Sequence, residues 1–211
     1  MGNAGNFIRV LLLLAFSLAG IVEWPNIALA AQSDHDGVYG RLDGDISLSP
    51  SIGIAQFRGK TEPLLGFQAM YVSTLGLAFS HANTRFTFGA DAASRSTTAI
   101  EFRLCPLFLG RWAEALEVGP PMLDLALDSF TIGLGAFWDY DQRLGTLQRG
   151  TSVSTGLSLP FFRQMMGPWL NAMFGLRFAD GPAFSARTDA VAGVSLSWTW
   201  LVDSKIHADD W

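Results

Sequence analysis

The stretch RFTFGADAASRSTTAIEFR, residues 85–103, decides the fold. All of its charged side chains fall at odd positions, whereas most even positions carry apolar side chains. Successive side chains of a strand point to opposite faces, so this pattern predicts a long β-strand with one charged and one apolar face. The charged positions are Arg85, Asp91, Arg95, Glu101 and Arg103, and the apolar ones include Phe86, Phe88, Ile100 and Phe102.

The same two-residue period recurs on both sides of this stretch. Upstream, apolar residues from Val38 onward alternate with Arg41, Asp43 and Asp45, and the phase continues past Pro50 through Ile52 and Ile54. Pro50 has no N–H for a ladder hydrogen bond, so it predicts a barrel rim, a bulge or a turn. The other runs are residues 65–79, followed by a predicted turn at 81–83, and residues 123–138, 152–159, 169–178 and 190–202.

Seven runs can be counted, and closed single-chain membrane barrels of this kind usually have an even number of strands. The sequence therefore predicts an all-β protein, a single antiparallel barrel of eight strands, with ten as the alternative. The missing strand is expected from a split of residues 38–57 or 122–138. In the run at residues 122–138 the parity of the apolar positions changes at residues 128–129, which indicates a β-bulge or a turn. A short loop helix is predicted near residues 111–117.

The N-terminus has the features of a cleaved signal peptide. Arg9 precedes an apolar segment of about 13–16 residues, which is shorter than the roughly 20 residues of a spanning helix. Ala28 and Ala30 then supply a small-x-small cleavage site. We expect residues 1–31 to be a signal peptide and residues 32–211 to be the barrel domain; a retained anchor is the alternative.

Composition narrows the partners and cofactors. The formal net charge of −5 gives no basic footprint, so no nucleic-acid partner is expected. Cys105 is the only cysteine, which rules out an intrachain disulfide and a cysteine-based metal site. Asp139 and Asp141 are interpreted as solvated loop charges rather than cation ligands. We expect no metal and no other cofactor.

The faces of the strands distinguish a membrane barrel from a soluble one. Charges of both signs on one face suit a narrow polar lumen, while the apolar face would meet lipid. The predicted lumen network comprises Arg41, Asp43, Asp45, Arg85, Asp91, Arg95, Glu101 and Arg103. Aromatic residues near the ends of runs suit the headgroup levels. The predicted membrane-interface aromatics are Tyr39, Phe86, Phe88, Trp138, Trp169, Trp198 and Trp200.

Over nearly all of residues 32–211, this pattern resembles the small outer-membrane β-barrel proteins of bacteria. The resemblance lies in architecture and involves no specific family motif. It implies a location in the outer membrane, with lipid and the export and barrel-assembly machinery as partners. Many such proteins end on an aromatic residue of the last strand, whereas here residues 203–210, most of them polar, separate Trp211 from the alternating Trp198 and Trp200.

The size of the chain excludes a general porin, because open channels need about 16–18 strands. The predicted function is a non-enzymatic structural, surface-interaction or narrow-pore role with a largely filled lumen. One alternative is an outer-membrane enzyme that modifies lipid or peptides. Its candidate residues are His81, Asp91 and Glu101, but Ser80 and His81 would point to opposite faces of a strand. The other alternative is a soluble secreted lipocalin-like binder. No residue is predicted to be catalytic.

Overall fold

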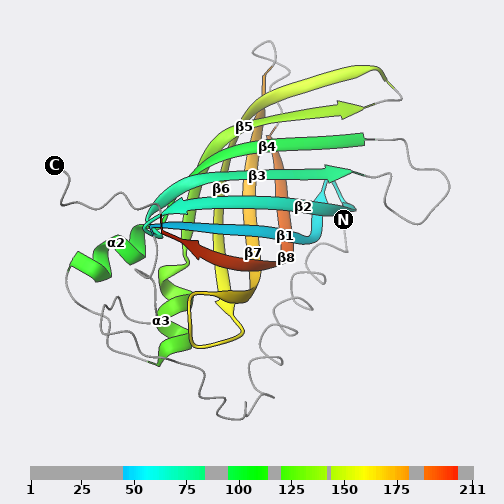
Figure 1. Cartoon of the computed structure of the whole chain (residues 1–211). Helices are drawn as coiled ribbons and strands as arrows, with labels where there is room; N and C mark the ends of the chain where they lie inside the picture. Colours follow the sequence, from blue (N-terminus) through cyan, green and yellow to red (C-terminus); the bar gives the residue numbers. More distant parts are fainter. Residues whose placement is uncertain (1–44, 84–94, 114–119, 142–143, 181–187, 204–211) are drawn as a thin grey trace. The chain divides into compact units, whose positions relative to one another are not determined.

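The computed structural model describes residues 45–83, 95–113, 120–141, 144–180 and 188–203. Within these residues, eight antiparallel strands, paired in sequence order, form a closed barrel, as the sequence predicts (Figure 1). The strands are β1 (Ile46–Phe57), β2 (Lys60–Tyr71), β3 (Leu75–Asn83), β4 (Arg95–Leu104), β5 (Thr131–Asp141), β6 (Thr146–Pro160), β7 (Gly167–Ala179) and β8 (Thr188–Val202). The ladder between β1 and β8 closes the barrel.

The two ends of the barrel differ in their connections. At one end, here called the loop end, lie the β1–β2, β3–β4, β5–β6 and β7–β8 connections. The β1–β2 connection is a two-residue turn, in which Arg58 and Gly59 have φ of 48° and 76°. Positive φ at both central residues is the geometry that matches the twist of a tight hairpin. At the other end, here called the helix end, lie the β2–β3, β4–β5 and β6–β7 connections, and the β4–β5 connection contains helices.

The eighth strand comes from residues 65–79, so the prediction that residues 38–57 or 122–138 would supply it is wrong. Tyr71 and Leu75 pair across a three-residue connection and both lie on the outer face. An odd-numbered connection preserves parity, and the alternation therefore passes through the turn unbroken. Val72 and Ser73 adopt φ of 45° and 53° without a glycine to signal it. The predicted turn at residues 81–83 is also wrong, because these residues complete β3.

The described part of the β4–β5 connection contains two helices, α2 (Pro106–Ala113) and α3 (Pro121–Asp128). The predicted helix at residues 111–117 is therefore displaced: α2 begins at Pro106, and residues 114–119 lie outside the described part of the chain. The predicted strand pattern at residues 123–128 is wrong, because these residues form α3. Pro121 is favourable at the first helical position, and Ser129 is the C-cap of α3. The parity change at residues 128–129 therefore marks the end of this helix before β5. Within the described ranges, neither helix has the length and apolarity needed to cross a bilayer.

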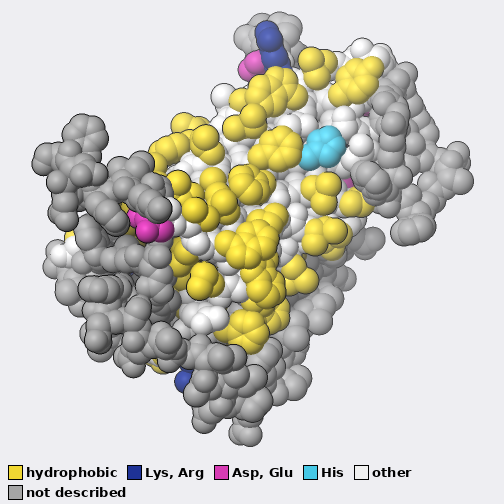
Figure 2. All heavy atoms as spheres, viewed as in Figure 1, with side chains coloured by type: hydrophobic (Ala, Val, Ile, Leu, Met, Phe, Trp, Pro, Cys, Tyr) yellow, Lys and Arg dark blue, Asp and Glu magenta, His cyan; other side chains and the backbone are white. Residues whose placement is uncertain are grey.

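The barrel carries its apolar side chains on the outside. Ile52, Leu134 and Leu196 are 65%, 62% and 50% exposed, although each lies in a strand. Figure 2 shows hydrophobic side chains spread over one side of the barrel, with few charged ones among them. The opposite parity points into the lumen and includes buried charged residues such as Glu62, Glu101 and Asp139. The two faces therefore have the reverse of the polarity expected for a soluble barrel with an apolar core.

Candidate functional site

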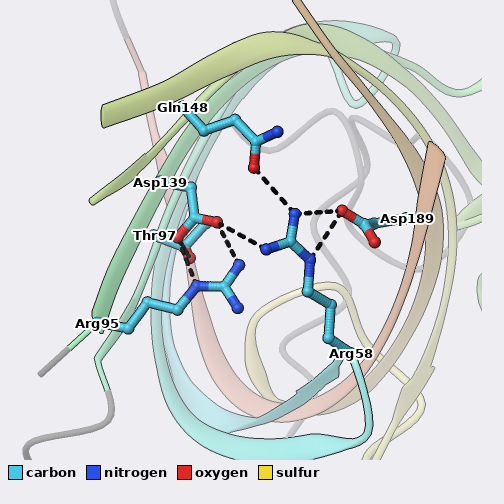
Figure 3. A network of polar contacts seen from close by, with 6 residues as sticks. All are labelled: Arg58, Arg95, Thr97, Asp139, Gln148 and Asp189. Atoms are coloured by element: carbon cyan, nitrogen blue, oxygen red, sulfur yellow. Dashed lines mark hydrogen bonds and ion pairs between the residues drawn. The ribbon is translucent and has the colours of Figure 1, made fainter. Parts of the chain in front are cut away.

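A network of charged and polar side chains crosses the lumen at the loop end (Figure 3). This loop-end network consists of Arg58, Arg95, Thr97, Asp139, Gln148 and Asp189. Arg58 leaves the β1–β2 turn and donates to Asp189 Oδ2 from Nε (2.9 Å) and Nη2 (2.5 Å). Its Nη2 also donates to Gln148 Oε1 at 2.9 Å, and its Nη1 lies 3.9 Å from Asp139 Oδ2. One side chain thereby connects β5, β6 and β8.

Asp139 is the second centre of the loop-end network. Arg95 Nε donates to Asp139 Oδ1 at 2.6 Å, and Arg95 Nη2 donates to Oδ2. Thr97 Oγ1 donates to Asp139 Oδ1 at 3.1 Å. A bidentate arginine–carboxylate pair of this kind fixes the orientation of both groups. It holds β4 against β5 on the lumen side.

Two phenylalanines form an aromatic layer beneath this network. Phe57 and Phe137 are 3% and 2% exposed. The guanidinium carbons of Arg58, Arg95 and Arg177 lie 4.9, 4.1 and 5.2 Å from the centre of the Phe57 ring, distances typical of cation–π contacts. A void of about 10 Å³ lies beside Phe57, and Glu62 and Arg177 are among its other lining residues. Such a void has room for about one water molecule.

A second polar cluster lies further towards the helix end. Glu101 accepts hydrogen bonds from Ser152 Oγ at 3.1 Å and Ser154 Oγ at 2.8 Å. Arg103 lies beside it, with Nη2 3.3 Å from Glu101 Oε2 and Nη1 2.7 Å from Gln68 Oε1. Gly133 leaves room for the carboxylate, because a Cβ there would come within 3.1 Å of Glu101 Oε2.

Below this cluster lies a cavity of about 120 Å³, here called the helix-end chamber. Serine and threonine hydroxyls from β1 and β8 line one side, and Met70, Phe108, Leu125 and Trp169 are among its apolar lining residues. Phe108 from α2 and Leu125 from α3 are 2% and 1% exposed, so the two helices close much of this end.

Polar contacts hold the helices in place. Arg111 of α2 contacts two carboxylates of α3, with Nη2 2.5 Å from Asp124 Oδ1 and Nη1 3.5 Å from Asp128 Oδ1. Ser129 Oγ donates to the Ser158 carbonyl and accepts from the Ser158 N–H, at 2.7 and 2.8 Å. These contacts attach α3 to α2 on one side and to β6 on the other.

Cys105 lies between β4 and α2 and also lines the helix-end chamber. The residue is 5% exposed, and burial raises the pKa of its thiol to about 12. A thiol with such a pKa is almost wholly protonated at neutral pH and is therefore a poor nucleophile.

The structure places three of the predicted lumen residues, Arg95, Glu101 and Arg103, inside the barrel. Asp45 directly precedes β1 at the helix end. Arg41, Asp43, Arg85 and Asp91 lie outside the described residues.

Of the predicted interface aromatics, Trp138, Trp198 and Trp200 face outward and are 39%, 49% and 49% exposed. Trp169 does not: it is 4% exposed on the lumen side, and its indole N–H donates to the Met165 carbonyl at 2.9 Å. Its assignment to the interface is therefore wrong. Tyr39, Phe86 and Phe88 lie outside the described residues.

Several lumen residues are not among those predicted from the sequence, namely Arg58, Glu62, Asp139, Gln148, Arg177 and Asp189. For two of them, the alternation of side chains along the strand indicates the inward direction. Asp139 alternates with the outward Trp138, and Arg177 has the parity of Trp169, opposite to the outward Phe174 and Phe178. The interpretation of Asp139 as a solvated loop charge is wrong, because β5 continues through it and the residue is buried. Arg58 gave no such signal, because it lies in a turn.

The candidate residues for catalysis are not brought together. His81 has the outward parity of β3, and its Nδ1 lies 3.0 Å from Thr98 Oγ1 of β4. Ser80 and Glu101 have the inward parity of their strands, and Asp91 lies outside the described residues. Among the residues that the structure describes, no group of three or more histidine, cysteine, aspartate or glutamate side chains is arranged to hold a metal ion.

Comparisons with known proteins give likenesses of structure. The N-terminal β-barrel domain of OprF from Pseudomonas aeruginosa is similar over 74% of this chain and 99% of its own length, with 12% identity and a TM-score of 0.45. Ail, the attachment invasion locus protein of Yersinia pestis, in complex with the heparin analogue sucrose octasulfate, is similar over 74% of this chain and 96% of its own, with 10% identity and a TM-score of 0.35. No protein-family model matches the sequence, and no curated protein matches it.

Proposed function

We propose that this chain is a bacterial outer-membrane barrel with a closed lumen and a non-enzymatic role as a membrane-embedded structural or surface-interaction protein. The observation that carries the proposal is the reversed polarity of the wall. Exposed apolar residues such as Ile52 and Leu134 would be costly in water over so large a continuous area. In lipid, the same side chains are solvated and the buried charges face one another inside.

The height of the apolar wall supports a bilayer. On β8 the outward positions from Ala190 to Trp200 carry only alanine, valine, leucine and tryptophan. This segment spans roughly 33 Å along the strand, at about 3.3 Å per residue. With a strand tilt of roughly 40°, it covers about 25 Å along the barrel axis, which is the height of the apolar band in outer-membrane barrels.

The side chains that cross the lumen support a structural role over transport. A solute that passed along the lumen would meet the loop-end network and the aromatic layer of Phe57 and Phe137. At the helix end, α2 and α3 cover much of the opening. Charged and hydrogen-bonded side chains that fill the lumen stabilise the barrel from within. The loop end is then the surface available to partners, with an open recess of about 610 Å³ that Arg58, Arg149 and Asp180 help to line.

Two measurements on the mature protein test the proposal. In gels of detergent-extracted outer membrane, we expect a compact band that shifts on boiling, and in planar bilayers we expect no large conductance step. A protein that is soluble without detergent and shows no heat shift would contradict the membrane location. A heat-shifting protein with a large, steady conductance would retain the barrel but contradict the closed lumen.

A further inference from the structure

The ladder that closes the barrel is interrupted at one place. β1 and β8 pair at residues 46–48 and again at residues 51–57, but Ser49 and Pro50 have no partner in this ladder. The seven other ladders run without a gap over the described residues. Pro50 has no N–H and cannot donate a ladder hydrogen bond. The β1–β8 seam is therefore weakest at Pro50.

A side-chain hydrogen bond bridges this gap on the inner side. Ser49 Oγ lies 2.8 Å from Thr199 Oγ1, so the two hydroxyls connect β1 and β8 where the backbone pairs are missing. On the outer side, Pro50 and Trp198 have the lipid-facing parity, and Trp198 is 49% exposed. Only this contact and the flanking pairs need to part for the wall to open locally.

The helix-end chamber lies directly behind the gap. Both Ser49 and Thr199 line it, and so do the apolar side chains of Met70, Phe108 and Trp169. The volume of about 120 Å³ approaches that of an engineered apolar cavity of about 150 Å³ that binds benzene. Methionine side chains are flexible and adapt to a guest, so Met70 would let the space vary.

Much of the polar lining is already bonded within the wall. Besides the Ser49–Thr199 bond, Asn171 Nδ2 donates to Ser197 Oγ at 2.9 Å. The charged lining residues are Arg103, paired with Glu101, and Asp128, near Arg111. Arg103 Nε and Ser73 Oγ have no hydrogen-bond partner, which leaves these two polar atoms of the lining for water. The surface that remains for a guest is mainly apolar.

We propose that the helix-end chamber binds the end of a single acyl chain, which enters from the bilayer through the β1–β8 seam at Pro50. This inference rests on the proposed membrane location of the barrel. The chamber supplies the apolar contacts, the interrupted ladder supplies the entry, and the rest of the chain stays in the lipid. A bilayer is the source because the outer side of the gap belongs to the apolar wall.

Photocrosslinking of the mature barrel in phospholipid vesicles tests this route. The probe is a palmitic acid that carries a diazirine at its methyl end, and labelled residues are located by mass spectrometry. We expect labels on Met70 and Phe108 inside the chamber, besides labels on Leu134 and Leu196 of the outer wall. In a Ser49→Cys/Thr199→Cys variant, a disulfide across the gap should reduce chamber labelling at least fivefold, and reduction of the disulfide should restore it.

Two further variants control the experiment. Ser80→Cys/Ala99→Cys places a disulfide between inward-facing partners of an uninterrupted ladder and should leave chamber labelling unchanged. Pro50→Ala restores an N–H without a disulfide and should lower chamber labelling about threefold. Equal chamber labelling with the Ser49–Thr199 disulfide closed and open would overturn the proposed entry. So would outer-wall labelling without chamber labelling in the unmodified protein. Loss of both labels together with the heat shift would instead refute the membrane location, and the inference with it.

Discussion

Several buried carboxylates of this protein, such as Asp139 and Glu101, have charged or hydroxyl partners in the lumen. Asp139 shows this most clearly, because its carboxylate contacts Arg95, Thr97 and Arg58. Its side chain is 5% exposed, so little of the carboxylate is open to solvent. Removal of one member of such a pair leaves the other charge buried and uncompensated.

We therefore expect Asp139→Asn to lower the free energy of unfolding by about 3 kcal/mol. Urea unfolding of the barrel in lipid vesicles, followed by tryptophan fluorescence, measures the change. Asp180→Asn is the matched control. Asp180 pairs with Arg149 at 3.7 Å where both side chains are mostly exposed, and the change there should stay within about 0.5 kcal/mol. Equal effects of the two substitutions would contradict a buried loop-end network.

The thiol of Cys105 provides a second test at the residue scale. Because burial raises its pKa to about 12, the folded protein should resist a maleimide at pH 8 and react only after boiling in detergent. Leu144→Cys places a thiol at a residue that is 73% exposed, and this thiol should react in the folded protein. Rapid labelling of Cys105 in the folded barrel would show that the helix-end chamber is open to reagent.

At the scale of the elements, α2 and α3 show how a short connection can close one end of a barrel. Leu125 of α3 faces the lumen and is 1% exposed, whereas Leu127 on the same helix is 39% exposed. The helix therefore has a packed side and an open side, and only the packed side contributes to the closure of the barrel.

Substitution of these two leucines separates the two sides. We expect Leu125→Ala to destabilise the folded protein by about 2–4 kcal/mol, because it removes buried methyl groups and leaves a cavity. Leu127→Ala should cost about 0.5 kcal/mol or less, in line with its exposure. Both values come from the same urea titration. A larger loss with Leu127→Ala would mean that its side of the helix is covered in the folded protein.

At the scale of the whole molecule, the polarity of the wall decides which solvent the barrel needs. Leu196 lies near the middle of β8, and its neighbours across the sheet are Ile52 and Leu170. In water an exposed leucine can become arginine at little cost. In a bilayer the same change places a charge in hydrocarbon.

Leu196→Arg should therefore lower stability in vesicles by about 2–4 kcal/mol. Leu144→Arg, at the loop end, should change it by about 0.5 kcal/mol or less. The two variants are compared by urea unfolding and by the fraction of protein that shows the heat shift. If Leu196→Arg left both the stability and the heat-shifting fraction unchanged, this face would not meet lipid.

Sequence alone determined the class of fold, because a two-residue period needs only local information. It predicted the eight-stranded barrel and the inward parity of Arg95, Glu101 and Arg103 in β4. It failed at residues 72–74, because a three-residue turn keeps the same side-chain parity in both strands and leaves no break in the alternation. It also failed at α3, where Leu123, Leu125 and Leu127 alternate over a segment too short to distinguish a helix from a strand.

Only the tertiary structure decided which residues meet across the lumen. The loop-end network joins Arg58 to Asp189, 131 positions away, and such a pair depends on the register of every strand between them and on the closure of β1 onto β8. The turn position of Arg58 carries no parity, so no periodic pattern could predict its inward direction. Likewise, Pro50 predicted a local break in a strand ladder from the sequence. Only closure of the barrel placed that break in the β1–β8 ladder, beside Thr199 and in front of the helix-end chamber.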